Sequence, residues 1–310
     1  MTSPLSPATG SVRVRVPAKI NLALKVGAPR PDGFHPLATV YQAVSLFDEV
    51  VADWAEPGRF EVSVAGEGAG LVPLDDRNLA LQAAHLLASR HARGDSVGVS
   101  LAIRKSIPVA GGLAGGSSNG AAALLACSVL WELDLGTEQL LSLAAELGSD
   151  VPFALIGGTA VGSGRGEEVV PALSTGTYHW VLAFGWHGLS TPAVYRRFDE
   201  LGGREAAHPT VPEDLMNALR SGEPAEVGRA LSNDLEPAAL DLQPQLRQTL
   251  AAGEELGALA SIVSGSGPTC AFLAASESAA VDLSVGLSAE GVCRAVRRAT
   301  GPVAGARVIS

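Results

Sequence analysis

A glycine-rich segment, residues 108–120, opens directly into a long run of alanine and leucine. The segment reads PVAGGLAGGSSNG, and the run that follows reads AAALLACSVLWEL. Glycine lets the backbone approach a ligand closely, often at positive φ, and the first N–H groups of a helix attract negative charge. The segment therefore predicts a site for phosphate groups, here those of a nucleoside triphosphate.

Two common nucleotide-binding motifs do not fit this segment. A P-loop needs Lys and then Ser or Thr after its last glycine, and a dinucleotide site needs G-x-G-x-x-G with an acidic residue about 20 positions on. A purely structural turn stays open as an alternative. Ser117 and Ser118 stand where a helix N-cap is expected, so their hydroxyls can cap the helix, contact a triphosphate or its Mg²⁺, or do both.

Length and composition favour a two-domain globular enzyme. One core seldom grows past about 250–300 residues, and this chain has 310, of which 47% are hydrophobic. The formal net charge of −10 argues against a nucleic-acid-binding surface, where a basic stripe is expected. A local pocket of cations and N–H donors for a small anion remains compatible with that charge.

The cysteines and the amino terminus indicate a soluble, cytoplasmic protein. Cys127, Cys270 and Cys293 are odd in number, lie in apolar or alanine-rich segments, and lack metal-ligand spacing. The amino-terminal MTSPLSPATG lacks the charged and apolar regions of a signal peptide. No segment reaches the ~20 apolar residues of a membrane-spanning helix.

The first half of the chain predicts an α+β domain whose helices cover one face of a sheet. Apolar residues alternate from Val12 to Val26, which indicates a strand with a bend at Pro17 and Ala18. Lys19 and Asn21 share the other face of that strand. Further strands are expected at 40–51, 60–65 and 96–103, and helices at 78–90, 117–133 and 137–147, the last with Thr137 as its N-cap and Gly148 just beyond its end.

The pattern restarts after residue 165, where we expect a domain boundary that separates residues 1–165 from 166–310. A strand is expected at 178–185, and Thr191-Pro192 is typical of a helix start with a hydroxyl N-cap. The remaining expected elements are helices at 212–220, 224–231 and 243–256, and a strand, a tight SGSGPT turn and a strand over 262–273.

Asp150 and Lys19 are the residues that most directly suggest catalysis. Asp150, in GSDVP, can cap a short helical turn at Val151-Pro152, or it can act as a general base on a hydroxyl group. Lys19 can be a solvated strand residue. Near Asp150 it would instead keep the carboxylate ionised and counter the charge of a transferred phosphoryl group.

Phe34 and His35 follow a Pro-Asp-Gly turn in RPDGFHPL. They can pack in the core, which the residues alone favour, or form a platform on which a nucleobase stacks. His179, His187 and the other histidines have no partner at metal-ligand spacing, so we expect them to be structural. We assign no residue as a metal ligand, and any direct protein ligand of Mg²⁺ stays open.

Taken together, PAKINLAL, PVAGGLAGGSSNG and SGSGPTCAF resemble the GHMP kinase superfamily. Within it, RPDGFHPL, the doubled-glycine GLAGGSSN, GSDVPF and SNDLEP resemble the kinases that act on a cytidine-diphosphate-linked methylerythritol. Mevalonate, homoserine and galactose kinases generally lack the DGFH segment. The similarity extends from about Val12 to Val308.

The resemblance implies an ATP- and Mg²⁺-dependent transfer to the 2-hydroxyl of that small-molecule substrate, in the non-mevalonate isoprenoid pathway. It implies an N-terminal ribosomal-protein-S5-like α/β domain, the ATP-binding one, and a C-terminal ferredoxin-like domain. The active site would lie in the cleft between them. It implies neither a nucleic-acid nor a membrane partner, and leaves monomer and homodimer open.

The resemblance also implies roles for individual residues. Lys19 and Asp150 match the catalytic pair. The substrate-binding positions are Asn21, Phe34, His35, Thr191 and Tyr195, with His35 reading the cytosine edge and the two aromatic rings enclosing the base. Phe34 stands where Tyr is common, which keeps stacking and removes any hydrogen bond from a phenol.

The positions that match the ATP site lie mostly in the glycine-rich segment. They are Pro108, Val109, Ala110, Gly111, Gly112, Leu113, Ala114, Gly115, Gly116, Ser117 and Ser118, together with Lys105 and Asn78. Ala110 and Ala114 stand where glycine is frequent in the family.

Three alternatives remain at this point. One is another kinase of the superfamily, acting on homoserine or mevalonate. A second is a non-catalytic nucleotide-binding regulator on the same fold, which the presence of both Lys19 and Asp150 disfavours. The third, a dinucleotide-dependent oxidoreductase, lacks its motif.

Overall fold

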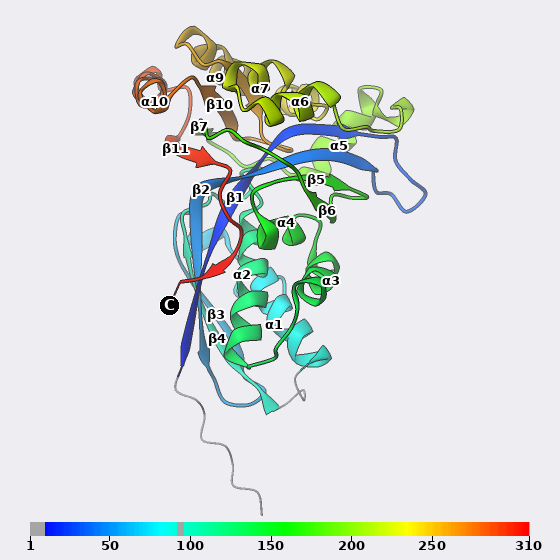
Figure 1. Ribbon diagram of the computed structural model, residues 1–310, viewed down its shortest axis with the longest axis vertical. Coiled ribbons are helices and arrows are strands. Elements are labelled where there is room, and N and C mark those ends of the chain that lie inside the picture. The colour runs from blue at the N-terminus through cyan, green and yellow to red at the C-terminus, as the bar shows by residue number, and fades with distance from the viewer. Residues whose placement is uncertain (1–9, 92–95, 310) are drawn as a thin grey trace, which may run out of the picture.

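Two long antiparallel strands, β1 (Ser11–Val26) and β2 (Leu37–Trp54), run from the first domain into the second (Figure 1). The computed structural model describes residues 10–91 and 96–309, so the polar tail expected over residues 1–10 lies almost wholly outside the described residues. The pairing register of β1 and β2 shifts between Pro17 and Ala18, which confirms the bend expected there.

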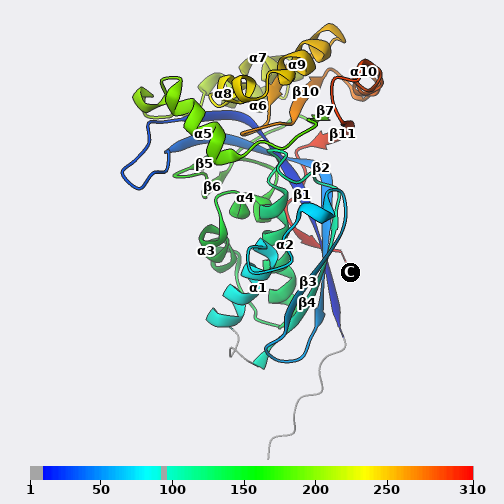
Figure 2. The same ribbon diagram turned by 180° about the vertical axis from the view of Figure 1, so that it is seen from behind.

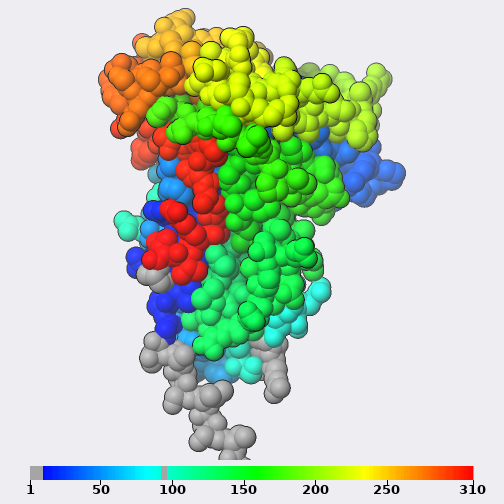
Figure 3. All heavy atoms as spheres, viewed as in Figure 1, coloured from blue at the N-terminus to red at the C-terminus, as the bar shows by residue number. Residues whose placement is uncertain are grey.

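The first sheet has the strand order β12-β1-β2-β4-β3, with β5 and β6 continuing from β2 and β8 pairing with β1. The additional strands are β3 (Phe60–Gly66), β4 (Val99–Lys105), β5 (Thr159–Ser163), β6 (Glu168–Pro171), β8 (Ser232–Asn233) and β12 (Arg307–Val308). After the second domain the chain returns along the first domain to β12, as the red segment in Figure 3 shows.

Helices cover one face of the first sheet, as predicted (Figures 1 and 2). They are α1 (Leu79–Arg90), α2 (Gly115–Leu130), α3 (Thr137–Leu147) and α4 (Val151–Ile156), with a 3₁₀ turn at Ala69–Leu71. The central helix α2 is buried along most of its length, which explains its run of alanine: small side chains let α1 and the sheet approach it from both sides.

The second domain is a four-stranded antiparallel sheet with the order β11-β7-β10-β9. Its strands are β7 (Tyr178–Phe184), β9 (Ala260–Val263), β10 (Cys270–Ala274) and β11 (Ala295–Gly301). Numbered along the chain, this order is 4-1-3-2, with helices between the first and second strands and between the third and fourth. That is the ferredoxin-like arrangement, and it confirms the expectation for this half.

Six helices lie in the described part of the second domain. They are α5 (Thr191–Glu200), α6 (Glu213–Ser221), α7 (Pro224–Ala230), α8 (Glu236–Leu242), α9 (Gln245–Glu255) and α10 (Glu277–Glu290), with a 3₁₀ turn at Gly203–Glu205. Residues of β1 such as Ile20 and Leu22 share a buried cluster with Trp180 and Leu182 of β7. The Trp180 indole also donates to Gln42 Oε1 at 2.9 Å, so the two sheets share a core at their junction.

Several element boundaries differ from the sequence prediction. Strand β4 begins at Val99 rather than 96, and the sequence reading missed α8, α10, β5, β6 and β11. The chain leaves the first sheet after Pro171 and enters the second at Tyr178, while β8 and β12 return to the first. A division near residue 165 remains our proposal for the domain limits.

Three predicted helix caps are wrong. Helix α2 begins at Gly115 with Ala114 as its N-cap, so Ser117 and Ser118 lie inside its first turn. Helix α3 has Gly136 at the N-cap, where the Gln139 side chain accepts from the Gly136 N–H, and helix α5 has Ser190 there instead of Thr191. In each case the helix starts earlier than the hydroxyl residue suggested.

The three cysteines are free and buried, as expected. Within residues 10–91 and 96–309, no helix is both long and apolar enough to span a bilayer.

A buried polar cluster anchors the start of the glycine-rich segment to β2. The Asp48 carboxylate, fully buried, accepts from the Lys105 ammonium, from Asn119 Nδ2 at 2.8 Å, and from the backbone N–H groups of Ser106 and Ile107 at 2.6 and 2.9 Å. Lys105 also donates to Asn119 Oδ1 at 3.0 Å. A buried carboxylate with this many donors stabilises the fold chiefly because every group in the cluster is paired.

We predict that Asp48→Ala strongly destabilises the protein, because it leaves the Lys105 ammonium buried without a countercharge. Breaking such a pair costs about 3–5 kcal/mol in the free energy of unfolding, measured by urea denaturation. Asp75→Ala, which removes an exposed partner of Arg77, is the control and should leave the midpoint nearly unchanged. Equal effects of the two substitutions would contradict the role of the cluster.

Candidate active site

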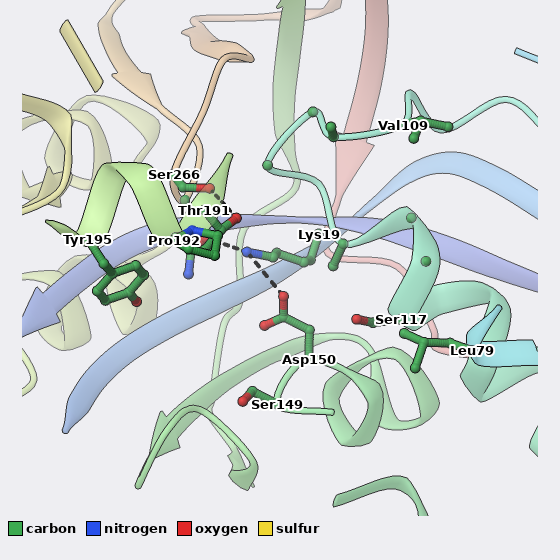
Figure 4. Close-up of a pocket in the computed structure, with 18 of the residues that line it drawn as sticks. Lys19, Leu79, Val109, Ser117, Ser149, Asp150, Thr191, Pro192, Tyr195 and Ser266 are labelled. Atoms are coloured by element: carbon green, nitrogen blue, oxygen red, sulfur yellow. Dashed lines mark hydrogen bonds and ion pairs between the residues drawn. The ribbon is translucent and has the colours of Figure 1, made fainter. Parts of the chain in front are cut away.

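A cleft of about 810 Å³ lies between the two domains and is lined by residues from both. Of the site residues expected from the sequence, all but Leu113 and Ser118 line it. Segments far apart in the chain thus meet at one surface: β1, the glycine-rich segment, the start of α4 and the start of α5 (Figure 4).

The glycine-rich segment delivers the N-terminus of α2 to the cleft. Its backbone takes positive φ at Ala110 (53°), Gly112 (75°) and Ala114 (58°), and the helix follows at once. A Cβ on Gly112 would lie 2.2 Å from the Ser264 carbonyl oxygen, so only glycine fits there. A free helix N-terminus next to small residues is the arrangement expected for binding phosphate groups.

The two serines of this segment behave differently. Ser117 lines the cleft, whereas the buried Ser118 hydroxyl donates to the Pro17 carbonyl at 2.9 Å. Ser118 therefore connects α2 to β1 at the bend and does not line the cleft. Leu113 is fully buried and does not line the cleft either. The expected ATP contact of these two positions has no support in their placement.

We predict that Ala114→Gly leaves stability unchanged or raises it by up to about 1 kcal/mol. The left-handed conformation costs a non-glycine residue about 1–2 kcal/mol, and the added freedom of glycine in the unfolded chain offsets part of the relief. Ala121→Gly, inside α2, is the control and should destabilise by ~1 kcal/mol or more. Urea unfolding compares the two, and an equal loss in both would refute the strain at residue 114.

Lys19 and Asp150 point toward one another across the cleft floor (Figure 4). Lys19 Nζ lies 3.8 Å from Asp150 Oδ2 and donates to Asn21 Oδ1 at 2.6 Å. Asn21 Nδ2 in turn donates to Thr39 Oγ1 at 2.8 Å, which fixes the amide so that its oxygen faces Lys19. Lys19 is buried, so it is not the solvated strand residue of the alternative interpretation.

Asp150 occupies the N-cap position of α4, but its side chain makes no capping hydrogen bond. The capping interpretation is therefore wrong in its chemistry, although the position in the chain is that of a cap. The side chain is 28% exposed, so the carboxylate can reach both Lys19 and a ligand.

Two tyrosines close the cleft around Asp150. Burial and the negative charge of Asp150 raise the pKa of Tyr41 and of Tyr195 well above the usual phenol value. Both phenols therefore stay neutral throughout the working pH range. The Tyr41 ring also lies 5.5 Å from Lys19 Nζ, so aromatic surface limits the access of water to the ammonium.

Phe34 and His35 have different surroundings. Phe34 is 51% exposed and lines the cleft, with the Arg165 guanidinium carbon 5.0 Å from its ring centre, so the core-packing interpretation is wrong for Phe34. His35 is buried: Nδ1 donates to the Gly27 carbonyl at 2.8 Å, and Nε2 lies 3.5 Å from Asp199 Oδ1. The centres of the His35 and Tyr195 rings are 5.1 Å apart, so the connection between β1 and β2 meets α5 at this point.

Lys105, Asn78 and Thr191 line the cleft with polar groups already engaged in the protein. The Lys105 ammonium belongs to the Asp48 cluster. Asn78 is the N-cap of α1, accepting from the Ala80 N–H at 2.9 Å and donating to the Pro73 carbonyl at 2.8 Å. The Thr191 and Ser266 hydroxyls share a hydrogen bond of 2.9 Å.

Sequence reasoning missed the loop after β9 as part of the site. A Cβ on Gly265 would lie 3.4 Å from Lys19 Nζ and 3.3 Å from Asn21 Oδ1, so this backbone packs directly on Lys19. Asn233 holds the loop by donating to the Val263 and Gly265 carbonyls, each at 2.8 Å. The sequence segments SGSGPT and SNDLEP, which contain Gly265 and Asn233, were noted in the sequence, but no role in the site was assigned to them.

Sequence reasoning also missed four charged residues of the cleft, which are Arg77, Arg165, Arg196 and Asp199. Sequence analysis had marked the region of Arg165 only as a domain boundary, and it assigned no role to Arg196 although Thr191 and Tyr195 lie nearby. Among the described residues, no group of three or more His, Cys, Asp or Glu side chains could hold a metal ion by itself.

Family models match both halves of the chain. The GHMP kinases N terminal domain matches residues 78–158, and the GHMP kinases C terminal domain matches residues 215–293. These matches cover the glycine-rich segment, α4 and most of the second domain.

Curated relatives match nearly the whole chain. The 4-diphosphocytidyl-2-C-methyl-D-erythritol kinase of Mycolicibacterium smegmatis is 55% identical over 304 residues, covering 97% of this chain and 93% of the relative. The enzyme of the same name from Streptomyces coelicolor is 54% identical over 300 residues, covering 96% and 99%.

Solved structures of GHMP kinases have the same fold as this chain. A 4-(cytidine 5'-diphospho)-2C-methyl-D-erythritol kinase superimposes with a TM-score of 0.74 at 32% identity, covering 93% of this chain and 98% of its own. A homoserine kinase from Cytophaga hutchinsonii gives a TM-score of 0.75 at 19% identity, covering 99% and 100%. The second likeness concerns the fold alone.

Proposed function

Because the chain belongs to the 4-diphosphocytidyl-2-C-methyl-D-erythritol kinases of the GHMP kinase superfamily, we propose that it phosphorylates the 2-hydroxyl of 4-diphosphocytidyl-2-C-methyl-D-erythritol with ATP. The reaction is a step of the non-mevalonate isoprenoid pathway. The observation that carries the proposal is the identity of 54–55% to kinases of this name over nearly the full chain. The Lys19–Asp150 pair in the cleft supports it chemically.

The proposed mechanism uses positioning and charge. The glycine-rich segment and the α2 N-terminus bind the triphosphate of ATP, with the dipole of the helix favouring the anion. Asp150 accepts the proton of the acceptor hydroxyl and orients its oxygen toward the γ-phosphorus. Lys19, held by Asn21, stabilises the charge that develops on the transferred phosphoryl group.

Mg²⁺ is the proposed metal, bound mainly through the phosphates of ATP. Magnesium in such sites keeps several waters and takes one or two carboxylates. The Ser117 hydroxyl, which lines the cleft, would add an oxygen ligand, while the Asp150 carboxylate serves the acceptor hydroxyl. When bound, the ion neutralises phosphate charge.

The part of the cleft that binds the cytidine-linked substrate is proposed to lie between the two domains, near Phe34 and Tyr195. Phe34 provides an exposed ring, and His35 is fixed in place by Gly27 and Tyr195. We propose that the cytosine ring stacks here. Three free, buried thiols support a reducing compartment such as the cytoplasm.

Product analysis tests the proposed function. The purified protein is incubated with ATP, Mg²⁺ and the cytidine-linked methylerythritol, and phosphorus NMR identifies a new 2-phosphate. Homoserine and mevalonate serve as competing acceptors, and we expect no product from either. Phosphorylation of one of these and not of the cytidine substrate would overturn the proposal.

We predict that Asp150→Asn lowers kcat by about 10²–10⁴, the usual contribution of a general base. ATP binding, measured by calorimetry, should remain nearly unchanged because the amide keeps the size of the side chain. Asp53→Asn, at an exposed position that does not line the cleft, is the control. Near-normal turnover of Asp150→Asn would exclude the general-base role.

We predict that Phe34→Ala raises KM for the cytidine substrate far more than KM for ATP. Loss of stacking on one base is worth roughly 1–3 kcal/mol, which corresponds to about 5- to 150-fold. Phe34→Tyr keeps the ring and should stay near the wild type. A parallel rise of both KM values in Phe34→Ala would remove this residue from the base site.

A further inference from the structure

Five cationic side chains line the cleft within the described part of the chain: Lys19, Arg77, Lys105, Arg165 and Arg196. The proposed reaction brings two groups of phosphates into this cleft, the triphosphate of ATP and the diphosphate of the acceptor. The glycine-rich segment accounts for the first group. The residues that hold the second are not explained by the catalytic pair.

Four of the five cations are already matched with carboxylates. Lys19 lies 3.8 Å from Asp150, and Lys105 is paired with the buried Asp48. Arg77 Nη2 lies 2.8 Å from Asp75 Oδ2, and Arg165 Nε lies 3.4 Å from Glu167 Oε1. Each of these four groups therefore already has a carboxylate that offsets part of its charge.

Arg196 differs from these four cations. Over residues 10–91 and 96–309, no carboxylate oxygen lies within 4.0 Å of its guanidinium, although its neighbour Arg197 pairs with both Asp241 and Glu200. Asp199, one turn further along α5, directs Oδ1 toward His35 instead. Arg196 is also exposed, so packing in the core does not explain it.

The position of Arg196 on α5 places it at the acceptor end of the cleft. It directly follows Tyr195, whose ring packs against His35, and Thr191, Pro192 and Tyr195 line the same cleft. The glycine-rich segment belongs to the first domain, whereas α5 belongs to the second. The Arg196 guanidinium therefore lies on the second-domain side of the cleft, next to the proposed cytosine site.

We propose that Arg196 binds the diphosphate that links cytidine to the methylerythritol, and so selects a cytidine diphosphate ligand over cytidine itself. The inference rests on the proposed function. Guanidinium and phosphate oxygens match in a two-pronged geometry, and the hydrogen bonds are charge-assisted. In a chain with a net charge of −10, an uncommitted cation at this point also offsets repulsion of the entering anion.

The test compares Arg196→Gln with the matched control Arg197→Gln, whose side chain does not line the cleft. At saturating ATP and Mg²⁺, inhibition constants are measured for CDP and for cytidine against the cytidine-linked substrate. We expect Arg196→Gln to weaken CDP and the substrate by about 10- to 100-fold, the range for a hydrogen bond to a charged group. Cytidine inhibition and KM for ATP should not change.

Arg196→Lys keeps the charge and should recover part of the CDP affinity. The inference is overturned if Arg196→Gln leaves CDP unaffected, weakens CDP and cytidine equally, or acts on KM for ATP instead. Equal losses in the Arg197→Gln control would also overturn it. These outcomes are distinct from failure of the proposed function, in which the wild-type protein neither uses the cytidine substrate nor binds CDP.

Discussion

The buried ammonium group of Lys19 is the constraint on which the site depends. A charge removed from water must be paired, and the groups around this ammonium come from its own strand and from two distant segments. Asn21 accepts from it, Asp150 lies 3.8 Å away, and the Gly265 backbone packs against it. Each partner is fixed separately, Asn21 by Thr39 and the Gly265 loop by Asn233. The Gly265 loop belongs to the second domain, so the surroundings of Lys19 are complete only where the two domains meet.

The glycine-rich segment is held in shape by contacts with the second domain. The Ser264 hydroxyl donates to the Gly112 carbonyl at 3.1 Å, and the Thr269 N–H donates to the Gly111 carbonyl at 3.3 Å. The second domain thus holds the segment from one side, while the Asp48 cluster holds its start from the other. A loop fixed at both ends loses little further entropy when it binds phosphates, which is the structural meaning of preorganisation.

Local patterns in the sequence predicted what local physics controls. Alternation in residues 12–26 identified β1 and placed Lys19 and Asn21 on one face, and the resemblance supplied the ferredoxin-like domain. The N-cap of α2 was predicted wrongly because Ala114 takes a left-handed conformation that the local residue pattern does not indicate. Asp48 and Arg196 were missed for a related reason: their roles depend on which charges lie nearby in space, and Lys105 is 57 positions from Asp48. Residues within known sequence motifs could therefore be predicted. Residues such as Asp48 and Arg196, whose role depends on which charges lie near them in the fold, could not.

The most direct test of this account is a crystal structure with a non-hydrolysable ATP analogue, Mg²⁺ and the cytidine-linked substrate. The measured quantity is the distance from the acceptor 2-hydroxyl oxygen to the Asp150 carboxylate. The account predicts a hydrogen bond of about 2.6–3.2 Å, with the same oxygen facing the γ-phosphorus and Lys19 beside the γ-phosphate. An Asp150 side chain turned back to cap α4, with the hydroxyl bound to another group, would contradict it.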